Sequence, residues 1–312
     1  MRSGSGEPGP DTMKKCIFSI DVEDWFHILD LPSTPPVSSW DGLPSRVERN
    51  LLNLLDLFGE TDTKVTCFFL GWVGEKYPHL VREARQRGHE IASHGYAHQL
   101  VYRTTREEFA QDVTRSRKLL EDIAGCAVLG YRSPGFSVVE ETPWFFEVLM
   151  EAGYAYDSSV FPAPRGHGGM RSGRHAPYRM GDAERGLIEF PITVTKFLGR
   201  PFCCFGGGYL RLFPLSVIER MTRKVLSEGR PVVFYVHPRE IDALHPRLPM
   251  GFARRFKSYV NLNTTEHKLR RLASTFTGST FVEYLALMSE AAASAAPDSM
   301  ASGRSMAVEG SL

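Results

Sequence analysis

Short apolar segments alternate with amphipathic segments along most of the chain. The apolar segments have the length and composition of buried strands and span 16–21, 64–70, 89–93, 128–132, 154–159, 187–192 and 231–237. Apolar residues recur with helical spacing between them, at 45–58, 78–88, 106–125, 142–153 and 214–229. This alternation predicts an α/β fold of parallel strands joined by crossover helices, either a barrel or an open doubly wound sheet.

Three segments depart from this alternation. Residues 1–13 are rich in Gly, Ser and Pro, and residues 286–312 are dominated by small residues, so both are predicted to be disordered tails. Residues 161–186 contain many Gly, Arg and His residues and are predicted to form a long loop. A single folded domain with a C-terminal extension is therefore expected at 14–285.

Composition narrows the class of protein. The 312 residues are 42% hydrophobic, which is enough for a large core, and the net charge of +1 gives no overall attraction to nucleic acid or to an anionic membrane. The N-terminus has no apolar signal region, and no stretch approaches the roughly 20 apolar residues that span a bilayer. The five cysteines are interpreted as reduced thiols. A cytoplasmic location is expected, with peripheral association with the inner membrane as a second option.

Polar side chains follow several of the predicted strands at the point where each strand ends. Asp21, Glu23 and Asp24 stand at the end of the first strand, His94 and His98 follow the third, and His237 closes the last. The carboxyl ends of parallel strands share one rim, where enzymes with parallel α/β barrels place their catalytic groups. Carboxylates and imidazoles gathered there indicate a metal-dependent hydrolase.

Each of these signals also has a structural alternative. His94 and His98 are four residues apart, which on a helical turn would place both imidazoles on one face, but they could equally be surface or capping histidines. Asp21 or Asp24 could cap a helix instead of binding metal. The zincin peptidase pattern requires Glu after the first His, and this chain has Gly95, so that class is excluded.

Five short motifs occur in the order found in a known family. They are Asp21-Val22-Glu23, His94-x-x-x-His98, Arg132-Ser133-Pro134-Gly135, Asp157-Ser158-Ser159 and Val236-His237-Pro238. In this order they resemble the polysaccharide deacetylase family (carbohydrate esterase family 4, NodB homology). The run Asp-Val-Glu-Asp-Trp-Phe at 21–26 is similar to the start of a subgroup associated with bacterial exopolysaccharide and exosortase (PEP-CTERM) loci. The resemblance covers roughly residues 14–285.

The resemblance implies a distorted (β/α)₇ barrel of the NodB-homology type with a divalent metal, Zn²⁺ being the expected ion. It implies that His94, His98 and Glu23 are the metal ligands, with Asp24 as second choice for the carboxylate. Asp21 matches the catalytic base. The commonest form of the first motif has two adjacent Asp residues, whereas here Val22 intervenes.

The other motifs receive roles from the same resemblance. Arg132 is expected to hold Asp21 ionised and oriented, and Asp157 is expected to orient His237, which would protonate the departing amine. Four residues beside the motifs are expected to contact substrate. Trp25 and Tyr96 would stack on sugar rings, and a backbone N–H near Tyr131 would bind the oxyanion. Pro134 is the fourth.

The expected reaction is the removal of N-acetyl groups from amino sugars of a bacterial polysaccharide or its precursor. The expected partner is an N-acetylated glycan and not nucleic acid, and the oligomeric state is left open. One alternative is a cyclic-amide hydrolase of the allantoinase kind on the same fold. The other is a catalytically silent glycan-binding or scaffold protein, since Glu23 stands where a metal-binding Asp is usual.

Overall fold

The computed structural model describes residues 13–163, 168–170, 173–182, 185–197 and 199–295. Its strands are β1 (Cys16–Val22), β2 (Thr66–Phe69), β3 (Glu90–Ser93), β4 (Gly130–Tyr131), β5 (Tyr156–Asp157), β6 (Tyr178–Met180), β7 (Leu187–Glu189), β8 (Thr195–Phe197), β9 (Arg200–Phe202), β10 (Val232–Val236) and β11 (Gly278–Ser279). Its α-helices are α1 (Val47–Gly59), α2 (Gly71–Lys76), α3 (Pro78–Gln86), α4 (Arg106–Ala124), α5 (Phe145–Glu151), α6 (Gly207–Leu212), α7 (Leu215–Ser227), α8 (Phe252–Tyr259), α9 (Thr265–Thr275) and α10 (Phe281–Ala295). None of these helices is long and apolar enough to cross a membrane.

The main sheet is parallel over most of its width. In the described part of the chain its order is β10-β1-β2-β3-β4-β5-β7-β6, with β11 beside β1, and only β6 runs antiparallel to its neighbour. The segment after β7 returns to β10, where Thr193 Oγ1 accepts a hydrogen bond from Val233 N at 2.8 Å. The sheet is therefore curled, as expected for a distorted (β/α)₇ barrel.

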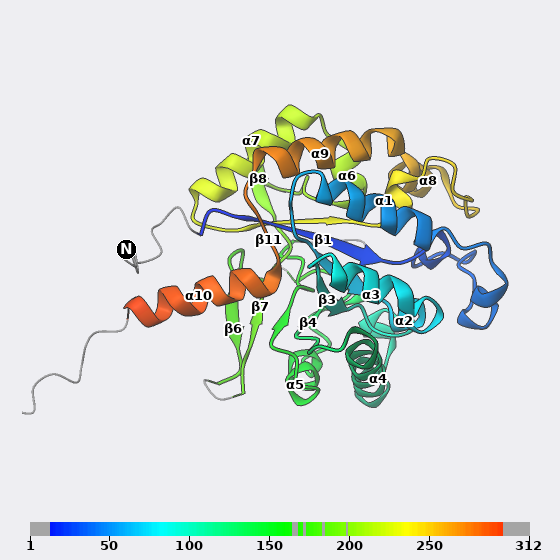
Figure 1. Ribbon diagram of the computed structural model, residues 1–312, viewed down its shortest axis with the longest axis horizontal. Helices are drawn as coiled ribbons and strands as arrows, with labels where there is room; N and C mark the ends of the chain where they lie inside the picture. The colour runs from blue at the N-terminus through cyan, green and yellow to red at the C-terminus, as the bar shows by residue number, and fades with distance from the viewer. Residues whose placement is uncertain (1–12, 164–167, 171–172, 183–184, 198, 296–312) are drawn as a thin grey trace, which may run out of the picture.

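Burial on both faces explains why β1 and β10 read as continuous apolar runs. Every residue of either strand is buried, and the rings of Phe18 and Phe234 stack at a centroid distance of 5.1 Å. Figure 1 shows α1, α7 and α9 on one side of the sheet and α2, α3, α4 and α5 on the other. The helix α1 turns Leu51, Leu54 and Phe58 into this core.

The parallel arrangement brings the carboxyl ends of β1, β3 and β10 to one edge. In Figure 1 the arrow of β1 points toward the side of the molecule that carries α8. Asp21 lies near the end of β1, and Glu23, His94 and His237 come directly after the three strands. Topology therefore places them at a common rim.

Two predictions about irregular segments were wrong. The helix α10 continues to Ala295, past the predicted domain end at residue 285, because Ala is a strong helix former and Leu285 and Met288 pack on the core. The strand β6 lies inside 161–186, which was predicted to be a loop, because it pairs with β7 and forms the edge of the sheet. The predicted tails at 1–13 and 286–312 otherwise lie almost wholly outside the described residues.

Candidate metal centre and active site

Three buried side chains converge at the predicted rim. One ligand atom from each of Glu23, His94 and His98 lies within 4.8 Å of the other two, which suits a single ion. Glu23 follows β1, and His94 directly follows β3. The structure thus brings together the three residues that the sequence predicted as ligands.

A backbone carbonyl fixes the orientation of His94. Its Nδ1 donates to the carbonyl oxygen of Arg132 at 2.8 Å, and since a carbonyl can only accept, Nε2 keeps its lone pair for an ion. Burial lowers the pKa of His94 to about 4, against the raising effect of Asp21. The ring is therefore neutral at pH 7, as a metal ligand must be.

The turn between His94 and His98 is not helical, which corrects one detail of the sequence interpretation. Gly95 and His98 have φ values of 73° and 53°, in the left-handed region. The carboxylate of Asp112 on α4 holds the turn by accepting hydrogen bonds from the backbone of Tyr96 and Ala97 at 2.8 and 3.3 Å. The two imidazoles still meet, with ring centroids 5.2 Å apart.

The contact between Glu23 and His98 has the geometry of two ligands that face a common point. Glu23 Oε2 lies 2.7 Å from His98 Nε2, yet within the described structure this buried oxygen makes no hydrogen bond. Burial would raise the pKa of Glu23, but the charges of His98 and His237 outweigh it and hold the pKa well below its usual range. A buried carboxylate oxygen without a hydrogen bond fits a cation.

Asp24, the second choice as carboxylate ligand, is excluded by its hydrogen bonds. Its Oδ1 accepts from Trp25 N at 2.7 Å, and its Oδ2 accepts from Ser45 Oγ at 2.6 Å and from the backbone of Arg46 and Val47 at 2.9 and 3.2 Å. These donors lie at the start of α1 and of the short 3₁₀ helix Trp25–His27. Asp24 is therefore a capping residue, the structural alternative weighed for this motif.

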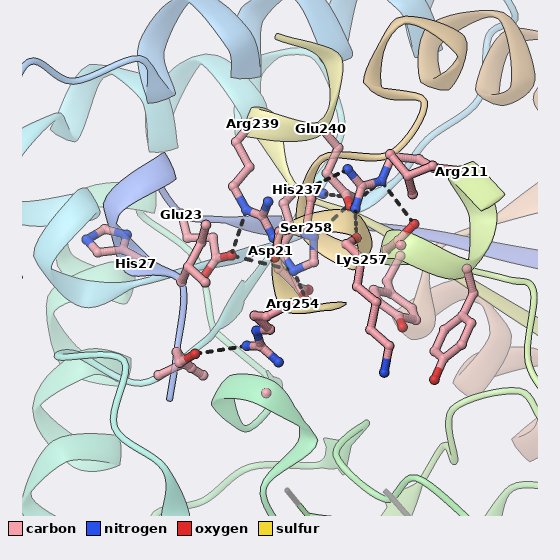
Figure 2. Close-up of a pocket in the computed structure, with 18 of the residues that line it drawn as sticks. Asp21, Glu23, His27, Arg211, His237, Arg239, Glu240, Arg254, Lys257 and Ser258 are labelled. Atoms are coloured by element: carbon pink, nitrogen blue, oxygen red, sulfur yellow. Dashed lines mark hydrogen bonds and ion pairs between the residues drawn. The ribbon is translucent and has the colours of Figure 1, made fainter. Parts of the chain in front are cut away.

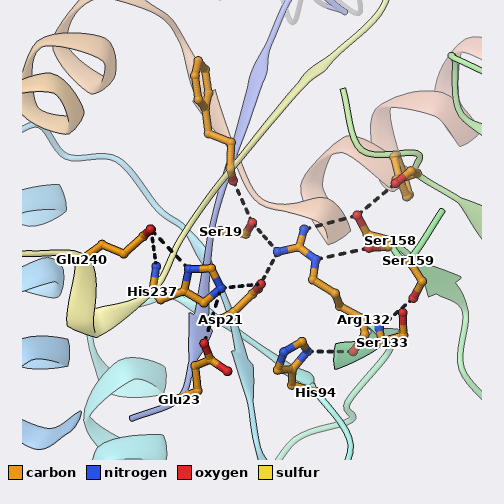
Figure 3. Close-up of polar contacts among 12 residues, drawn as sticks. Ser19, Asp21, Glu23, His94, Arg132, Ser133, Ser158, Ser159, His237 and Glu240 are labelled. Atoms are coloured by element: carbon orange, nitrogen blue, oxygen red, sulfur yellow. Dashed lines mark hydrogen bonds and ion pairs between the residues drawn. The ribbon is translucent and has the colours of Figure 1, made fainter. Parts of the chain in front are cut away.

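Arg132 and Asp21 form a fully buried ion pair (Figure 3). Arg132 Nη1 donates to Asp21 Oδ1 at 2.6 Å and to Ser19 Oγ at 2.8 Å. The guanidinium also donates to the carbonyl and hydroxyl of Ser158, each at 3.2 Å, and lies 4.1 Å over the ring of Phe68. A buried guanidinium with this many partners fixes the orientation of the Asp21 carboxylate.

His237 is oriented by Glu240 and not by Asp157, which corrects the sequence prediction. His237 Nδ1 lies 3.2 Å from Glu240 Oε2, which also accepts from the His237 backbone N–H at 3.1 Å (Figure 3). On its other side His237 Nε2 lies 3.8 Å from Asp21 Oδ2 and 3.6 Å from Glu23 Oε1. Burial lowers the pKa of His237, but Glu23 and Glu240 outweigh it, so the pKa is raised.

Asp157 belongs to a separate buried acidic pair. It is the cross-strand partner of Glu189, and the two buried carboxyl groups interact electrostatically. Its Oδ1 also accepts from Ser159 Oγ at 2.5 Å. Burial raises the pKa of Asp157 to about 6, and burial with the charge of Asp157 raises that of Glu189 further. Asp157 thus serves the sheet beneath the site, while Ser158 of the same motif supports Arg132.

A cavity of about 740 Å³ opens above this cluster. Asp21, Glu23, His94, His98 and His237 line one end of it, while residues of α6 and α8 line the other (Figure 2). The four residues expected to contact substrate are absent from its described lining: Trp25, Tyr96, Tyr131 and Pro134.

Each of these four side chains is engaged elsewhere. Trp25 Nε1 donates to Pro44 O at 3.0 Å, and the ring of Tyr131 packs in an aromatic core cluster. The ring of Tyr96 lies under Arg115 at 3.5 Å, and its hydroxyl donates to Glu75. Pro134 is buried, and its neighbours Gly135 and Phe136 reach the cavity instead.

Sequence reasoning missed three residues that border the cluster. Glu240 follows His237 at the three-residue spacing of a capping box, a signal that was available. Arg239 Nε lies 3.9 Å from Glu23 Oε1, and the ring of His27 lies 5.8 Å from that of His98. Nothing in the local sequence of Arg239 or His27 indicates that they reach this centre.

Comparison with known families divides the chain in two. Residues 37–156 match the model described as polysaccharide deacetylase, and residues 158–286 match a domain of unknown function (DUF3473). The first of these segments is therefore similar to the polysaccharide deacetylase family. His94, His98 and Arg132 lie in the first match and His237 and Glu240 in the second, so both matched segments of the chain contribute to the cluster.

The curated relatives share only part of the chain. A peptidoglycan-N-acetylglucosamine deacetylase of Bacillus cereus is 29% identical over 87 residues, which are 28% of this chain and 32% of that protein. A peptidoglycan deacetylase of Helicobacter pylori is 28% identical over 158 residues, which are 51% of this chain and 44% of that protein. The chain therefore spans less than half the length of either relative.

A solved structure supports the fold over nearly the whole length. A protein of Mycobacterium smegmatis described as a polysaccharide deacetylase aligns with 99% of this chain and 97% of its own, with a TM-score of 0.61 and 17% identity. The likeness extends the family fold across the DUF3473 segment as well.

Proposed function

We propose that this polysaccharide deacetylase homologue is a metal-dependent hydrolase that removes N-acetyl groups from amino sugars of a glycan. The observation that carries the proposal is the convergence of Glu23, His94 and His98 with Asp21 and His237 at one end of a single cavity. Three metal-binding groups beside one carboxylate and one imidazole are the groups that hydrolysis of an amide requires.

Glu23, His94 and His98 would hold the divalent ion, and two nitrogens with one carboxylate suit Zn²⁺. The buried Glu23 Oε2 without a hydrogen bond and the neutral His94 support this assignment. An ion bound there supplies Lewis acidity toward the acetamide carbonyl and the attacking water.

The chain's own residues then handle the protons. Asp21, held in place by Arg132, accepts the proton of the attacking water. His237 stands on the other side of Asp21 and donates a proton to the departing nitrogen, while Glu240 holds its ring in place. Acetate and a free amine are the products.

The substrate we propose is an N-acetylated bacterial polysaccharide or its precursor. The Bacillus cereus relative is described as acting on N-acetylglucosamine in peptidoglycan, and the cavity has room for a sugar with its acetamide. The motif at 21–26 supports membership of the exopolysaccharide-associated subgroup.

The test is acetate release from N-acetylglucosamine oligosaccharides by metal-stripped protein, before and after addition of Zn²⁺. Zinc-dependent release that is abolished in Asp21→Asn supports the proposal. Absence of release with one bound zinc per chain points to another amide, such as a cyclic one. Absence of both release and zinc binding favours a silent glycan-binding protein.

A further inference from the structure

The mouth of the cavity carries large apolar side chains that face solvent. Phe252 and Phe256 of α8 are 88% and 49% exposed, and Leu212 of α6 is 43% exposed. The two Phe residues are four positions apart and share one face of α8. All three line the cavity, so they form one exposed apolar rim, defined here as Leu212, Phe252 and Phe256.

The segment that carries this rim is strongly basic. Residues 243–265 contain four cationic side chains and no Asp or Glu: Arg247, Arg254, Arg255 and Lys257. The net charge of the whole chain is only +1, so the overall charge does not indicate this local excess of positive charge. The sequence argument against attraction to an anionic membrane therefore does not apply to this surface.

The rim is firmly attached to the active-site cluster. The buried guanidinium of Arg211 donates to the carbonyls of Lys257 and Ser258 at the end of α8, each at 2.9 Å, and lies 3.3 Å from Glu240 Oε1 (Figure 2). Arg254 Nη2 donates to Leu29 O at 2.9 Å, which ties α8 to the segment after β1. The position of α8 relative to His237 is thus fixed.

We propose that the exposed apolar rim docks the mouth of the cavity onto an anionic lipid surface. Phe252, Phe256 and Leu212 insert among the acyl chains near the headgroups, while Arg255 and Lys257 pair with lipid phosphates. The cavity then opens toward the membrane, where a lipid-linked amino sugar would be presented. The docking itself does not depend on the proposed deacetylase activity.

The chemistry of the rim favours lipid over a polymeric glycan as its occupant. Glycan-binding surfaces combine aromatic faces with carboxylates and amides that hydrogen-bond to hydroxyl groups, but α8, which carries Phe252 and Phe256, contains no Asp, Glu, Asn or Gln. The aliphatic Leu212 contributes to the rim, and Leu244 in the same basic segment is 85% exposed. Apolar side chains interspersed with cations match an anionic membrane interface.

The test is co-sedimentation of the full chain with vesicles of phosphatidylglycerol and phosphatidylcholine, compared with vesicles of phosphatidylcholine alone. We expect binding to the anionic vesicles that weakens as salt is raised. Phe252→Ala and Phe256→Ala should each weaken binding about tenfold, and Arg255→Gln about fivefold. Phe197→Ala is the matched control, because Phe197 is 48% exposed but lies outside the described cavity lining.

Circular dichroism of each variant verifies that it is folded. Absence of binding to the anionic vesicles overturns the proposal, and so does binding that the two Phe substitutions leave unchanged. A loss of chito-oligosaccharide binding in these variants, with vesicle binding intact, would assign the rim to a glycan and equally overturn it. Since vesicle binding is measured without turnover, its failure is distinguishable from failure of the deacetylase proposal.

Discussion

Glu240 holds His237 through two contacts with one oxygen. Glu240 Oε2 lies 3.2 Å from the His237 Nδ1 and accepts the His237 backbone N–H at 3.1 Å. Burial would raise the pKa of Glu240, but Arg211 and His237 lower it to about 2, so the carboxylate is ionised at neutral pH. The imidazole therefore presents Nε2 toward Asp21 in a fixed orientation.

Glu240→Gln should reduce turnover much more than it reduces metal binding. The substitution removes the charge that fixes and favours the protonated His237, and we expect kcat for acetate release to fall on the order of 100-fold. Bound zinc, measured by elemental analysis, should be unchanged. Asp157→Asn is the matched control, since Asp157 contacts Ser159 and Glu189 instead of His237. A larger loss of kcat in Asp157→Asn would show instead that Asp157 orients His237, as the sequence predicted.

Glu23→Gln and Asp24→Asn should separate metal binding from helix capping. Glu23→Gln removes a charged ligand, so we expect zinc affinity to fall about 10- to 100-fold in a competition titration with a chelator. Asp24→Asn leaves one oxygen and one amide nitrogen, which cannot accept hydrogen bonds from both groups of donors, so it should lower stability by about 1 kcal/mol while zinc affinity stays the same. The reverse outcome would make Asp24 the ligand.

Gly95→Ala should distort the turn that joins the two metal-binding histidines. Gly95 has a φ of 73°, and a Cβ there would lie 2.7 Å from Asp112 Oδ2. We expect a loss of about 1–2 kcal/mol in the free energy of unfolding, with weaker zinc binding. Gly42→Ala is the control, because a Cβ at Gly42 meets nothing within 4 Å. Equal effects of the two substitutions would contradict this explanation.

The acidic pair of Asp157 and Glu189 should make stability fall as pH rises. A carboxyl group whose pKa is raised on folding binds its proton more tightly in the native state, so stability is lost as pH rises through the native pKa. For Asp157 the window runs from about 4, the unfolded value, to about 6. Denaturant unfolding at about pH 4.5 and about pH 8 measures this loss, and the free energy of unfolding should be lower at the higher pH.

Glu189→Gln should remove the repulsion between the Asp157 and Glu189 carboxylates, which are both charged at high pH. We expect the variant to be more stable than the native chain at pH 8 by on the order of 2 kcal/mol, with a flatter dependence on pH. The exposed Glu147, which lies 3.6 Å from Arg106, provides the control substitution Glu147→Gln. An unchanged pH dependence in Glu189→Gln would show that Glu189 does not contribute to the fall in stability with pH.

Local sequence determined the elements and the rim on which the chemistry is placed. The strand at 16–21 and the helix at 106–125 were predictable, because burial on both faces and helical spacing depend on residues close together in the chain. The structure shows that Thr105 and Glu108 form a capping box at the start of this helix. Asp21, His94 and His237 were predictable as neighbours because each ends a parallel strand.

Tertiary structure decided which polar groups become partners. Glu23 faces His98 while Asp24 caps α1, although the two residues are adjacent, because successive side chains leave the backbone in different directions. Asp157 pairs with Glu189 through strand register, which leaves His237 to Glu240. The position of α8 above the cavity depends on Arg211, whose partners are distant in sequence, and no local pattern encodes such a contact.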